Sequence, residues 1–120
     1  MAFSIEKTED FIEVHVWGEA QPGEVMAILH KLREMAPRKE TSDLWVFPEE
    51  YVVPWDAFVT IVKEITGFVV PGMVGKKTAI VVANNFQMAQ GELYRKEAKA
   101  LPFEIGVFMS RDEAMEWLKT

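Results

Sequence analysis

The sequence predicts an α/β fold in a single domain over residues 1–120, with a five-stranded, mixed but mostly parallel sheet. Three observations carry this prediction. Strand-like runs of β-branched and aromatic residues alternate with segments whose apolar residues recur at helical spacing. The run at residues 78–83 is β-branched or apolar throughout, as in strands that are covered on both faces. The last strand, residues 104–108, leads directly into a helix at residues 110–118.

That final helix carries its own start signal. The Ser110 side chain can accept a hydrogen bond from an early helical N–H group, and Glu113 stands three residues on, at the spacing of a capping box. The apolar residues that follow are Ala114, Met115, Trp117 and Leu118. The sequence therefore predicts a C-terminal helix that docks on the sheet.

At the N-terminus, two strands are expected at residues 3–7 and 11–17, with a turn between them. Because no helix separates them, the first should pair antiparallel at an edge of the sheet. In the second, period-2 spacing places three apolar residues on one face, namely Ile12, Val14 and Val16.

Three more helices are expected between these strands and the C-terminus. The first begins near Pro22 and ends before Pro37. Its apolar stripe is Val25, Ile28 or Leu29, Leu32 and Met35. The second follows a strand at residues 44–47, begins at Pro54 and has the stripe Trp55, Phe58 or Val59, Val62 and Ile65. The third is capped by Asn84 or Asn85 and has as inward residues Phe86, Ala89 and Leu93.

The resulting element order is β-β-α-β-α-β-α-β-α. Alternating strands and helices favour a sheet with helices on both faces. With right-handed crossovers we expect the strand order 1-3-2-4-5, the first helix on one face and the second and third on the other.

Composition excludes several function classes. The net charge of −6 counts against nucleic-acid binding, because a phosphate backbone needs a basic stripe. The chain has no cysteine, which removes disulfides, thiolate nucleophiles and cysteine-based zinc sites. The longest uninterrupted apolar stretch, residues 79–83, is too short to span a bilayer. We expect a cytoplasmic protein.

Catalytic and metal-binding patterns are also missing. His15 and His30 lack the spacing of a zinc-binding pair. Glu49 and Glu50 are adjacent, so their carboxylates point apart instead of facing a substrate. The cluster of glycines at residues 67–75 precedes a strand, whereas nucleotide-binding loops follow one. We expect no enzyme activity, no catalytic residue, no metal and no cofactor.

Three segments carry a resemblance to a known family. They are "VFMSRDEAMEWL" at residues 107–118, "KKTAIVVAN" at 76–84 and "IEVHVWGEA" at 12–20. With this element order the chain resembles the SpoIIAA-like family of STAS folds, which is related to anti-sigma-factor antagonists and to lipid-carrying domains. The resemblance implies either protein partners or apolar ligands.

The chain departs from the regulatory STAS pattern at one point. In regulatory members, a phosphorylatable Ser or Thr begins the helix after the third strand. Here residues 44–58 read "LWVFPEEYVVPWDAF", without any hydroxyl of that kind, and Thr60 comes about two turns into the expected helix. We therefore expect no phosphorylation site in residues 44–58.

Two candidate surfaces follow. Apolar loops flank the second helix, and their aromatic and large residues either pack on the core or form an interaction surface, with Tyr51, Trp55, Phe68 and Met73. In the predicted strand order, a ligand crevice would lie between the second and fourth strands. Its rim would consist of Glu19, Gln21, Asn84, Asn85 and Gln87 with Trp55 alongside, although Asn84 or Asn85 could serve only as a helix cap.

The sequence thus favours a non-enzymatic STAS-like domain that binds a protein partner or forms a homodimer. The alternative is a carrier or sensor of a small apolar or lipid-like ligand.

Overall fold

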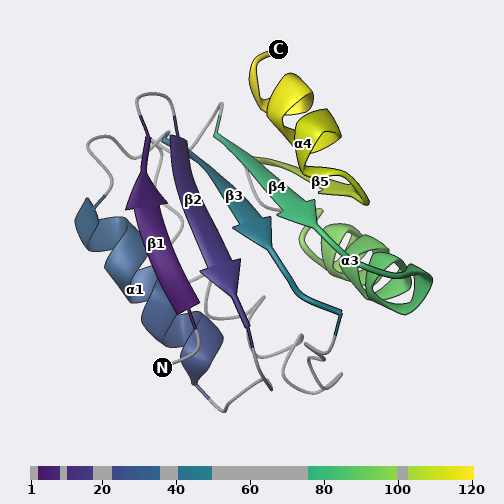
Figure 1. Cartoon of the computed structure of the whole chain (residues 1–120), viewed down its shortest axis with the longest axis horizontal. Helices are drawn as coiled ribbons and strands as arrows, with labels where there is room; N and C mark the ends of the chain where they lie inside the picture. Colours follow the sequence, from purple (N-terminus) through teal and green to yellow (C-terminus); the bar gives the residue numbers. More distant parts are fainter. Residues whose placement is uncertain (1–2, 9–10, 18–22, 36–40, 50–75, 100–102) are drawn as a thin grey trace.

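The computed structural model describes residues 3–8, 11–17, 23–35, 41–49, 76–99 and 103–120 (Figure 1). The elements in chain order are β1 (Phe3–Lys7), β2 (Phe11–Val16), α1 (Glu24–Met35), β3 (Ser42–Val46), β4 (Lys77–Val81), α3 (Asn85–Glu97), β5 (Glu104–Phe108) and α4 (Arg111–Leu118). The second helix predicted from the sequence lies outside the described residues.

The five strands form one sheet in the order β1-β2-β3-β4-β5. β1 runs antiparallel to β2, and the other neighbours are parallel. The predicted antiparallel edge strand at Phe3–Lys7 is confirmed. The two strands expected in the interior are confirmed as β3 and β4.

The predicted strand order 1-3-2-4-5 is wrong. β2 pairs with β1 on one side and with β3 on the other, with Val14 opposite Trp45. The physical reason is that crossover handedness decides on which face a connecting helix lies, and it is compatible with either order. Here each strand pairs with the strand next to it in sequence, the commoner arrangement.

The predicted placement of the third helix is wrong for the same reason. Each parallel step moves in the same direction across the sheet, so right-handed crossovers keep their helices on one face. α1 covers Ile12, Val14 and Trp45, while α3 covers Ile80 and its neighbours on that same face. α4 packs on the opposite face, against a cluster that includes Phe11, Leu44, Ala79 and Val81. The helices therefore cover both faces of the sheet, as expected (Figure 1).

α1 uses the apolar stripe that its sequence predicts. Ile28 is fully buried, Leu32 is buried and Met35 is half-buried against the sheet. The side chains of Val25 and Leu29 lie outside the described part of the chain.

α3 is turned differently from the prediction. Phe86 and Leu93 are 61% and 42% exposed and Ala89 is also exposed, so the expected inward face points to solvent. The buried residues are instead Gln87 and Gly91. A Cβ placed on Gly91 would lie 2.7 Å from Val107 Cγ1, so the glycine lets α3 approach β5 closely. This close approach and the hydrogen bonds of Gln87 select the inward face.

Candidate functional site

The predicted amide residues lie where β4 ends and α3 begins. Gln87 is buried; its Oε1 accepts from the Ala83 N–H at 2.7 Å, and its Nε2 donates to the Pro48 carbonyl at 2.6 Å. Asn84 is the N-cap of α3, and its Oδ1 accepts from the Gln87 N–H at 2.9 Å. Both amide groups also donate to the Glu49 carbonyl, at 3.4 Å from Asn84 and 3.3 Å from Gln87.

These bonds join the segment after β3 to the start of α3. Asn84 therefore has the capping role that the sequence left open, while Asn85 is exposed in the first turn of α3. A ligand crevice between β2 and β4 requires these strands to be neighbours, and β3 lies between them. Asn84, Asn85 and Gln87 do lie together at the end of β4, where α3 begins.

Several predicted site residues lie outside the described residues. They are Glu19, Gln21 and Trp55 of the ligand rim and Tyr51, Phe68 and Met73 of the interaction surface.

A cluster of charged residues lies on the α4 face of the sheet. The Glu13 carboxylate on β2 is buried, and Arg111 on α4 donates to it twice, from Nε to Oε2 at 3.0 Å and from the terminal nitrogen Nη2 to Oε1 at 2.6 Å. His15 Nε2 also contacts Glu13 Oε2. The Arg111 hydrogen bonds hold the pKa of Glu13 below its ordinary value of 4.5, against an opposing contribution from burial.

This cluster contains residue types found in active sites, yet its geometry is that of an ion pair. Ser4 lies opposite His15 in the β1–β2 register, but no hydrogen bond joins them in the described structure. Both Glu13 oxygens are engaged by Arg111, which leaves the carboxylate a weak base. The arrangement stabilises the docking of α4 and lacks the nucleophile–base hydrogen bond of acyl transfer.

A second ion pair lies on the opposite face of the sheet. Lys76 Nζ is 3.1 Å from Asp43 Oδ2, and both side chains are largely buried. Asp43 Oδ1 is buried and has no hydrogen-bond partner. Burial, with the Asp43 charge as a smaller contribution, raises the pKa of Tyr94. Tyr94 on α3 therefore stays protonated.

An open groove runs along the outer edge of β5. Its volume is about 450 Å³. One side is lined by Arg95 in the last turn of α3 and by Ala98 and Lys99 directly after it, and Trp117 of α4 lines the other. The floor consists of the residues at 103–108.

Sequence reasoning missed this groove and the Glu13 cluster. The only available signal for the groove was that the last strand would lie at an edge of either strand order. For Glu13, the signal was a carboxylate within a strand whose neighbours are apolar.

The described residues contain no group of three or more His, Cys, Asp or Glu side chains arranged to hold a metal ion. Among the described helices, none is long and apolar enough to cross a membrane.

Comparison with known proteins defines the fold. No protein-family model and no curated protein sequence matches the chain. One solved structure is similar, that of an uncharacterized protein from the DUF3478 family with a SpoIIAA-like fold, from Shewanella loihica PV-4. The TM-score is 0.63, and the similarity covers 98% of this chain and 92% of the other at 17% sequence identity.

The chain has a SpoIIAA-like fold. The resemblance found in the sequence is thus confirmed at the level of the fold, and at this identity it extends no further. In this chain β5 lies at an edge of the described sheet and contacts α4, which is the setting of the groove.

Proposed function

We propose that this chain is a non-enzymatic domain that binds a partner protein, a second copy of itself included. The observation that carries the proposal is the groove along β5, because it combines an edge of the described sheet with a basic wall at Arg95 and Lys99 and an aromatic wall at Trp117. Trp117 and Phe108, which line it, are of the aromatic type that protein interfaces favour.

Large apolar side chains are also exposed outside the groove. Phe86 and Leu93 on α3 are exposed, and Met109, directly after β5, is 48% exposed. Their burial against a partner protein would be favourable.

The charged clusters support a role without catalysis. The Glu13 carboxylate is engaged by Arg111 and that of Asp43 by Lys76, so these two buried carboxylates already have a cationic partner. Neither cluster lines the β5 groove.

Native mass spectrometry tests the proposal against the carrier alternative. A dimer mass, or a complex with a purified candidate partner, supports protein binding. A monomer that carries the extra mass of a bound small molecule supports the carrier instead. A monomer without added mass, which also binds none of the candidate partners, contradicts the proposal.

A further inference from the structure

In the described part of the chain, β5 is an edge strand, and no described strand pairs with its outer side. The Glu104 N–H donates to the Lys76 carbonyl at 3.0 Å, and the Val82 N–H donates to the Phe108 carbonyl at 2.8 Å. In a parallel ladder, alternate residues of a strand bond to the same neighbour. Ile105 and Val107 therefore direct their N–H and C=O groups away from β4, toward the outer edge.

Among the residues that the structure describes, this edge has little of the protection that edge strands usually have. Natural edges are commonly blocked by proline, lysine, a bulge or a covering element. β5 reads Glu-Ile-Gly-Val-Phe, with one charged residue, Glu104, at its start. The helices α3 and α4 flank the strand (Figure 1). The groove lies along β5, with Arg95 of α3 and Trp117 of α4 in its lining.

The two walls of the groove differ in chemistry. On the α3 side, Arg95 and Lys99 are exposed basic residues in a chain whose net charge is −6. On the α4 side, Trp117 packs against Phe108, with ring centroids 5.5 Å apart. An added strand would direct alternate side chains to these two walls.

We propose that the β5 edge accepts an extended segment of a partner protein as a sixth strand, in which acidic residues alternate with apolar or aromatic ones. The acidic side chains lie toward Arg95 and Lys99, and the apolar ones lie toward Trp117. Backbone hydrogen bonds to Ile105 and Val107 supply much of the affinity, and the two walls supply the specificity. This inference rests on the proposed function and adds the mode of binding and the class of partner.

The probe is a capped nine-residue peptide that alternates glutamate with valine or phenylalanine, and its control replaces each glutamate with lysine. Amide hydrogen exchange of the full chain is followed by NMR at increasing concentrations of the peptide. We expect saturating glutamate peptide to slow exchange at Ile105 and Val107 by about tenfold or more, as new backbone hydrogen bonds form.

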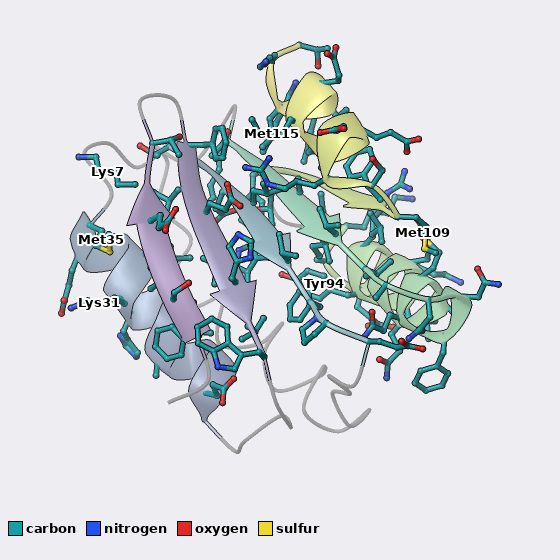
Figure 2. The ribbon with its side chains drawn as sticks, in the orientation of Figure 1. Lys7, Lys31, Met35, Tyr94, Met109 and Met115 are labelled. Carbon is teal, nitrogen blue, oxygen red and sulfur yellow. The ribbon has the colours of Figure 1, made fainter. Side chains whose placement is uncertain are left out.

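Charge reversal tests the specificity. The double variant Arg95→Glu/Lys99→Glu should weaken binding of the glutamate peptide by about tenfold and strengthen binding of the lysine peptide. Its matched control is Lys7→Glu/Lys31→Glu, which makes the same change in net charge at exposed positions on the β1 side of the sheet, away from β5 (Figure 2). The control should change binding by less than about twofold.

Three results would overturn the inference. The first is the absence of peptide binding at millimolar concentration; the second is binding without protection of Ile105 and Val107. The third is concentration-dependent protection of these amides without peptide, which would assign the edge to a second copy of the chain. If native mass spectrometry still detects a protein complex, the proposed function stands while the strand-addition mode fails.

Discussion

Arg111, the first residue of α4, donates two hydrogen bonds to the buried carboxylate of Glu13 on β2, a residue 98 positions earlier in the chain. The two bonds, of 3.0 and 2.6 Å, form a bidentate pair. They connect the C-terminal helix to the strand beside the antiparallel edge. They also give the buried charge of Glu13 a permanently cationic partner, in addition to its contact with His15 Nε2.

We expect Arg111→Ala to destabilise the fold by about 2 kcal/mol, because Glu13 stays buried and loses two charged donors. The loss is smaller than for a fully buried pair because the Arg111 side chain is 46% exposed and water replaces part of its bonding. The matched control is Arg95→Ala, which breaks an exposed ion pair with Glu92 and should cost about 0.5 kcal/mol or less. Urea unfolding measures both, and equal losses would contradict this account.

The same pair predicts a pH dependence. The pKa of Glu13 in the folded chain is lower than its ordinary value of 4.5, so its contribution to the free energy of unfolding is fully present above that pH. The contribution is lost as the pH falls from 4.5 through the lowered folded pKa. Stability should therefore fall less steeply below pH 4.5 in Glu13→Gln than in the native chain. Parallel curves for the two proteins in urea titrations over this acid range would refute the assignment.

The strand pattern of β5 and the capping residues of α3 and α4 predict the local structure correctly. Strand β5 has the predicted bounds, and Ser110 accepts a hydrogen bond from the Glu113 N–H as the capping pattern requires. Asn84 caps α3 for the same reason. These features depend on residues within one turn of each other, so the sequence contains the information directly.

Features that depend on distant residues were not predictable from one sequence. Strand neighbours are decided by contacts such as Val14 with Trp45, which the alternation of strands and helices leaves open. Gln87 resembles a surface residue in sequence, and its burial depends on the Pro48 carbonyl 39 positions away. The outward apolar face of α3 was missed because apolar spacing marks a stripe without showing which side the sheet takes.

The ion pair between Lys76 and Asp43 provides a second stability test. Lys76→Met keeps most of the side-chain volume and leaves the buried Asp43 carboxylate without its cationic partner. We expect a loss of about 3 kcal/mol, within the range for removing one partner of a buried pair. The double variant Asp43→Asn/Lys76→Met should recover part of this loss, since the buried charge is then absent. A double variant less stable than Lys76→Met alone would show that the carboxylate has another role.

The packing of Gly91 against Val107 gives the sharpest test of how α3 sits on the sheet. In Gly91→Ala the new Cβ would lie 2.7 Å from Val107 Cγ1, and the branched valine side chain has little freedom to move away. We expect destabilisation by about 1–3 kcal/mol, despite the higher helix propensity of alanine.

Val107→Ala should also destabilise the fold, through lost packing. In the double variant the two losses should partly cancel, with an interaction free energy of about 1 kcal/mol or more in a double-mutant cycle of urea midpoints. Additive losses would mean that α3 does not approach β5 at this point. The position of Arg95 and Lys99 beside the groove would then be wrong as well.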